Sequence, residues 1–151
     1  MFRSTSILVL LGAIGVSCSS TLTELSSTAR EVLTSSTFKA TYKDVFLATV
    51  HALQDEGYLV RVSDTETGTI EAEYDESGGF DGDFDTDLRR KVAASVRTRP
   101  AGTLVRFTLL VEERDDGTWF RTDPDAGLVE EVCARLFFRV DSELNAGGAN
   151  S

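Results

Sequence analysis

The sequence predicts an α+β fold, a two-layer sandwich in which a four-stranded antiparallel meander sheet carries two helices on one face. The amphipathic segments follow in the order helix, four strands, helix. Links of hairpin length between the strands make the sheet an antiparallel meander. Each helix has a single apolar stripe, so both most simply cover the same sheet face. At 151 residues, the chain suits one domain.

The first helix is predicted to begin after Thr41, a residue typical of the N-cap, and to end at Gly57, which accommodates the turn that stops a helix. A short strand at Thr37–Ala40 ahead of it is left open. The apolar stripe of this helix follows helical spacing. It comprises Tyr42, Val45, Phe46, Thr49, Val50 and Leu53.

Four segments then alternate apolar and polar residues, as half-buried strands do. Their inward positions are Tyr58, Val60 and Val62; Ile70, Ala72 and Tyr74; Val92, Ala94, Val96 and Thr98; and Val105, Phe107, Leu109 and Val111. Thr118–Arg121 is expected to add a brief extended piece, with Trp119 and Phe120 packed over one end of the core.

The closing helix is predicted to start with Asp123 as N-cap and Pro124 as the first helical residue. Its apolar stripe comprises Leu128, Val129, Val132, Cys133, Leu136, Phe137, Val140 and Leu144. On this face Cys133 is expected to be a buried structural thiol.

Composition excludes several classes of function. With 15 Lys and Arg against 25 Asp and Glu, the net charge of −10 disfavours nucleic acid, whose binding depends on basic side chains. One His and two Cys cannot build a Cys/His zinc site or a disulfide scaffold. His51 is expected to be an ordinary surface residue. We find no nucleophile, base and orienting group in a recognisable pattern and expect no enzyme and no cofactor.

The N-terminus has the pattern of a secretion signal. Ile7–Val16 is an uncharged apolar run, too short to cross a bilayer, and Ile14–Cys18 follows it directly. The sequence Ile-Gly-Val-Ser-Cys resembles the lipobox of bacterial lipoproteins, in which the cysteine becomes lipid-modified and N-terminal. We therefore expect residues 1–17 to be a lipoprotein signal peptide and Cys18 to be lipidated. Ordinary secretion with cleavage near Ser17 is the alternative.

The expected domain organisation follows from the composition after Cys18. Ser19–Thr37 contains eleven Ser or Thr, so we expect residues 18–37 to be a tether, with a short helix around Leu22–Leu33 as the alternative. A single α+β domain is expected over residues 38–144, and residues 145–151 are expected to be a flexible tail. By resemblance to lipoproteins of bacteria with two membranes, Ser19 at the second mature position favours the outer membrane.

The segment from the first helix into the following hairpin resembles a known group. Ala52-Leu53-Gln-Asp-Glu-Gly57-Tyr58, a strand, and then Thr67-Gly68-Thr69-Ile70-Glu71-Ala72 are similar to helix-grip domains of bacterial envelope lipoproteins. These include uncharacterised lipoprotein families and, more distantly, the C lipoprotein of the outer-membrane β-barrel assembly machinery. The resemblance implies an envelope module without established catalytic residues.

An acidic segment supplies the candidate metal ligands. Asp81, Asp83, Asp85 and Asp87 place carboxylates at alternate positions, and Ca²⁺ takes six to eight oxygens. The spacing does not match an EF-hand. A solvated acidic loop is the favoured interpretation, with a weak metal site or partner contact as alternatives.

The polar face of the strands supplies the candidate partner-binding residues. Arg97, Arg99 and Arg106 lie on neighbouring strands and could grip carboxylate or phosphate groups. Cross-strand pairing of the arginines of this face with Glu71, Glu73 and Glu112 is the favoured alternative.

Taken together, these observations predict a lipid-anchored, non-catalytic envelope protein that contacts another envelope component. The alternative function is a periplasmic domain that binds a small molecule or Ca²⁺, since grip-type folds can open a cavity between helix and sheet.

Overall fold

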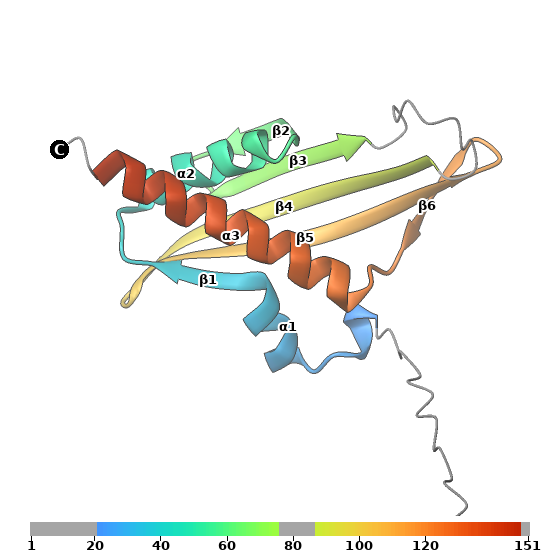
Figure 1. The fold of residues 1–151 in the computed structure, drawn as a ribbon, viewed down its shortest axis with the longest axis horizontal. Coiled ribbons are helices and arrows are strands. Elements are labelled where there is room, and N and C mark those ends of the chain that lie inside the picture. Colours follow the sequence, from blue (N-terminus) through green and yellow to red (C-terminus); the bar gives the residue numbers. More distant parts are fainter. Residues whose placement is uncertain (1–20, 76–86, 149–151) are drawn as a thin grey trace, which may run out of the picture.

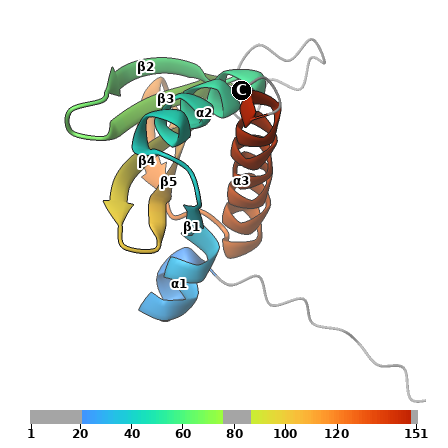
Figure 2. The same cartoon turned by 90° about the vertical axis from the view of Figure 1, so that its left-hand side faces the viewer.

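The computed structural model describes residues 21–75 and 87–148, which form an α+β domain with an antiparallel sheet (Figures 1 and 2). The long helices α2 (Tyr42–Asp55) and α3 (Ala126–Gly148) pack on one face of this sheet. The shorter α1 (Ser27–Thr34) lies beside β1 (Ser35–Phe38) at one sheet edge. The α+β class is confirmed, but the described residues contain a third helix.

The sheet is larger than expected. Strands β2 (Leu59–Asp64), β3 (Thr69–Asp75), β4 (Asp87–Arg99) and β5 (Gly102–Asp115) form the predicted meander. Two further strands, β1 and β6 (Thr118–Thr122), both pair with the remaining edge of β5. With 14 residues, β5 is long enough to take them one after the other. The described sheet therefore has six strands, and the prediction of four was wrong. The brief extended piece predicted at Thr118–Arg121 is confirmed as β6.

The predicted limits of α2 are confirmed. The Thr41 hydroxyl accepts a hydrogen bond from the Asp44 backbone nitrogen (3.3 Å), which caps the first turn. At the other end, Gly57 has a φ of 84°, a conformation that favours glycine. The backbone nitrogen of Tyr58 then donates to the Leu53 carbonyl oxygen (2.9 Å) and closes the helix end.

Strand β2 breaks the predicted alternation. Val60 pairs with Ala72, but Val62 pairs with Glu71, so the register shifts between them and Arg61 is the extra residue. Directly paired residues point to the same sheet face. Val62 therefore faces away from the core and is 42% exposed, and its predicted inward orientation was wrong.

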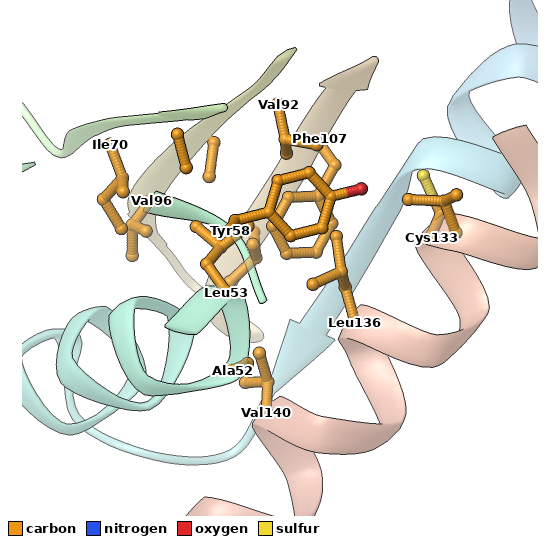
Figure 3. Packing of buried hydrophobic residues seen from close by; sticks show 14 of the residues in the cluster. Ala52, Leu53, Tyr58, Ile70, Val92, Val96, Phe107, Cys133, Leu136 and Val140 are labelled. Atoms are coloured by element: carbon orange, nitrogen blue, oxygen red, sulfur yellow. The ribbon is translucent and has the colours of Figure 1, made fainter. Parts of the chain in front are cut away.

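The hydrophobic core lies between the helices and the sheet (Figure 3). Leu53 of α2 and Leu136 of α3 meet Phe107 of β5 there, each almost fully buried. The Phe107 and Phe137 ring centres are 5.0 Å apart. Thr98 pairs with the buried Thr103 and so lies on the predicted side of the sheet, but it is exposed near the end of β4.

The start of α3 differs from the prediction. Asp125 is the capping residue, because its side chain accepts hydrogen bonds from the backbone nitrogens of Gly127 (2.8 Å) and Leu128 (3.2 Å). The Pro124 carbonyl oxygen instead accepts from the backbone nitrogen of Leu22 (3.0 Å). The helix therefore begins two residues later than Asp123 and Pro124 suggested.

The chain between Thr21 and Thr37, expected to belong to the tether, forms part of the domain. Thr21 bridges to Asp125, and Leu22 packs against the core. We call residues 21–24, which include the 3-10 helix η1 (Leu22–Glu24), the N-terminal clip. The helical alternative is realised as α1, and the optional strand lies at Ser35–Phe38 rather than Thr37–Ala40. Folded structure thus begins well before residue 38.

The C-terminal boundary also shifts, because α3 continues through Gly148 and includes part of the expected tail. The predicted signal peptide and Cys18 lie outside the described residues. No helix in the described ranges is long and apolar enough to cross a membrane.

Candidate functional site

The outer sheet face, opposite α2 and α3, carries the arginines predicted to bind a partner. Pairing between β4 and β5 sets Arg97 opposite Leu104, Arg99 opposite Gly102, and Arg106 opposite Ser95. Core residues such as Val96 and Val105 occupy the alternate positions. The three arginines therefore lie together near the β4–β5 turn, as predicted, and all are exposed.

Their interactions differ. Arg97 and Arg99 form no hydrogen bond or ion pair with any residue that the structure describes. Arg106 instead reaches α1, where its Nη2 atom lies 2.9 Å from Glu31 Oε1 and its Nε atom 3.4 Å from Ser35 Oγ. Only two of the three predicted arginines are thus available to a partner.

Elsewhere on this face the cross-strand alternative holds. Arg61 pairs with Glu73, with Nε 2.7 Å from Oε1. Lys91 Nζ lies 2.8 Å from Glu112 Oε2, and Arg89 is 3.8 Å from the same oxygen. Arg89 and Lys91 share the one carboxylate of Glu112, whereas Arg97 and Arg99 are contacted by no carboxylate that the structure describes.

Trp119 also belongs to the outer face. Its position opposite Arg114 puts it on the side away from the helices, and the Arg89 guanidinium lies 4.2 Å from its ring centre. Arg114 lies 6.0 Å away. Phe120 is 55% exposed. The expectation that both rings pack over the core was wrong, because Trp119 lies on the outer face and Phe120 is exposed.

A hollow of about 310 Å³ lies on the outer face between β2 and β5. Ala93 and Leu110 contribute apolar surface, whereas Arg61, Glu73 and Lys91 contribute charge. The exposed Leu59 and the reoriented Val62 add apolar area on β2. The face thus combines apolar and basic surface, as protein interfaces often do.

The predicted metal ligands Asp81, Asp83 and Asp85 lie outside the described residues, and only the backbone of Asp87, at the start of β4, is described. Within residues 21–75 and 87–148, no three His, Cys, Asp or Glu side chains gather in a way that could hold a metal ion. The suggestion of a weak Ca²⁺ site remains a prediction.

A second hollow, of about 430 Å³, lies where α2 meets the end of α3. His51 Nδ1 lies 3.3 Å from Glu143 Oε2 across it, and Asp44, Leu47 and Leu144 also line it. His51 is exposed, as expected, but its contact with Glu143 was not anticipated from the sequence. The sequence shows Glu143 near the end of the closing helix, but nothing in it indicates that this residue lies beside His51.

Cys133 is buried on α3, where the sequence placed it. Burial raises the pKa of its thiol to about 11. A thiol of that pKa is protonated and unreactive at neutral pH, which suits the predicted structural role.

The chain matches no family model and no curated protein. It is similar to a solved structure of the adenylate sensor from AMP-activated protein kinase in complex with 5-aminoimidazole-4-carboxamide 1-beta-D-ribofuranotide. The identity is 17%, and the match covers 72% of this chain and 94% of that chain with a TM-score of 0.43. A likeness at that level supports no conclusion about ligand or activity. The resemblance to envelope lipoproteins therefore remains a hypothesis.

Proposed function

We propose that this protein is a lipid-anchored, non-catalytic module of the cell envelope at the periplasmic side of the outer membrane. It contacts another envelope protein through the outer face of its sheet. The anchor is supported by the apolar run Ile7–Val16 followed by Cys18. We also propose that the domain is related to the helix-grip domains of bacterial envelope lipoproteins.

The observation that carries the contact is the state of Arg97 and Arg99. Both guanidinium groups are exposed on a sheet face that α2 and α3 leave uncovered, and neither is neutralised by a described residue. Arginine is enriched in interfaces because its planar donors bind carboxylates bidentately. Apolar surface at Leu59 and Leu110 extends the same face.

The anchor is tested by metabolic labelling with palmitate. The wild type should incorporate label, and Cys18→Ala should not. An unlabelled wild-type protein would remove the anchor from the proposal.

The contact is tested by cross-linking in intact cells. A specific cross-linked species should be lost in Arg97→Glu and Arg99→Glu. It should persist in Lys43→Glu, an equal charge change at an exposed position of α2. Equal recovery from all three variants would show that the outer sheet face is not the contact.

A second candidate is small-molecule binding in the hollow between α2 and α3. Asp44, His51 and Glu143 give this hollow an acidic lining suited to a cationic ligand. A screen of cationic metabolites by thermal shift, with Glu143→Gln as control, tests it. Shifts that are the same in wild type and variant would exclude this hollow as their source.

A further inference from the structure

The N-terminal clip ties the beginning of the domain to the start of α3. Besides the backbone contacts of Thr21 and Leu22, the Thr23 hydroxyl donates to the Asp123 carboxylate. Leu22 adds an apolar contact with the core. Backbone, polar and apolar contacts therefore all hold the clip in place.

The clip leaves little chain between the fold and Cys18. Thr21 follows Cys18 by three residues. A fully extended chain spans about 3.5 Å per residue, so these residues bridge about 10 Å. A lipid on Cys18 would hold the folded domain at the bilayer surface, whereas a tether through residue 37 would let it move well away.

The clip leads directly into α1 and β1, which lie together at one sheet edge, while β2 lies at the opposite edge (Figures 1 and 2). We call α1 and β1, with the adjoining Lys39, the α1–β1 edge. Its exposed groups include Arg30, Lys39 and Val32, which is 74% exposed. Arg30 and Lys39 form no ion pair within the described residues.

The basic and apolar groups of the α1–β1 edge suit contact with phospholipid headgroups. Basic side chains are attracted to anionic headgroups, and an exposed apolar side chain can enter the boundary between headgroups and acyl chains. Glu31, on the same helix, is neutralised by Arg106. Glu24, Asp123 and Asp125 at the clip repel anionic lipids, so headgroup contact should lie away from the clip. There Arg30 and Val32 lie on either side of Glu31 on α1, and Lys39 follows β1.

We propose that the α1–β1 edge lies on the surface of the membrane to which Cys18 is anchored. This inference rests on the proposed function, because Cys18 must carry lipid. The outer sheet face adjoins the edge and stays free, so it is presented to proteins that are themselves embedded in or anchored to the same membrane.

The test uses the mature lipidated protein in vesicles of phosphatidylethanolamine and phosphatidylglycerol. A fluorophore is attached through Val32→Cys on α1 or, as matched control, through Ser63→Cys on β2; both native positions are exposed. Buried Cys133 should not take the label. A lipid carrying a headgroup nitroxide should quench the label at position 32 several-fold more than the label at position 63.

The outcomes separate the two proposals. If the wild-type protein does not float with vesicles, the anchor fails and this inference fails with it. If it floats but both labels are quenched equally, the anchor stands and the inference is overturned, because the domain then samples all orientations.

A second pair of variants tests the clip itself. Leu22→Asp should release the clip and bring the quenching at the two labels together. Leu25→Asp makes the same charge change three residues away. Leu25 is half-buried and is not among the described residues packed on the core. This variant should therefore keep the difference in quenching between the two labels. Circular dichroism checks that each variant is folded. A folded Leu22→Asp protein that keeps the full difference would contradict the role of the clip.

Discussion

Arg106 on β5 and Glu31 on α1 form an ion pair of 2.9 Å between residues 75 positions apart in the sequence. The pair links the outer sheet face to the helix at the sheet edge. It removes Arg106 from the arginines available to a partner and neutralises the acidic group closest to Arg30 in the sequence. This one ion pair therefore affects the charge of both the outer sheet face and the α1–β1 edge.

We expect this pair to contribute little to stability. Its side chains are 46% and 63% exposed, and exposed pairs are typically worth about 0.2–1 kcal/mol. A double-mutant cycle with Arg106→Ala and Glu31→Ala, measured by urea unfolding, should give a coupling energy in that range that shrinks at high salt. A coupling of several kcal/mol would show that the pair is buried more deeply than the structure indicates.

Replacing Phe107 should damage the core severely. Phe107 is 1% exposed and packs against Phe137, so Phe107→Ala should lower the free energy of unfolding by about 3–5 kcal/mol. Phe120→Ala is the matched control, because Phe120 is 55% exposed. Urea unfolding should show a change below about 0.5 kcal/mol for the control. Similar losses in the two variants would contradict the assignment of the core.

Two glycines with similar backbone angles should respond differently to alanine. Gly68 and Gly117 have φ values of 74° and 80°, a region that costs an alanine roughly 1 kcal/mol or more. At position 68 a Cβ would also overlap the Val96 carbonyl oxygen, whereas at 117 it would meet nothing within 4 Å. Gly68→Ala should therefore lose about 1–3 kcal/mol more than Gly117→Ala in thermal unfolding. Equal losses would show that the β2–β3 turn can relax away from β4.

Much of the core follows from the spacing of apolar residues. Val45, Phe46 and Leu53 are buried along α2, and the alternating residues of β4 and β5 are buried on one sheet face. Burial obeys the geometric period of each element, so a single sequence is enough to predict it.

Features set by pairing between distant segments were not predictable in this way. The bulge at Arg61 depends on how β2 aligns with β3. Short extended pieces close to β1 and β6 were indicated by the sequence, but their pairing with the same edge of β5 was not. The same limit applies to the candidate site: the arginine positions were predicted, but the pairing of Arg106 with Glu31 and the stacking of Arg89 on Trp119 were not.

The stability of the protein should fall at alkaline pH through Cys133. Burial raises the pKa of this thiol from 9.0 to about 11, so the folded state holds the proton more tightly than the unfolded state. The contribution is fully present below pH 9 and is lost as pH rises toward 11, which corresponds to about 2–3 kcal/mol. Cys133→Ala should lose less stability over this range than the wild type, although it starts lower because of the cavity that it creates. If urea unfolding at pH 8 and pH 11 shows equal losses for both proteins, the thiol does not titrate between the two states, and another group accounts for the alkaline loss.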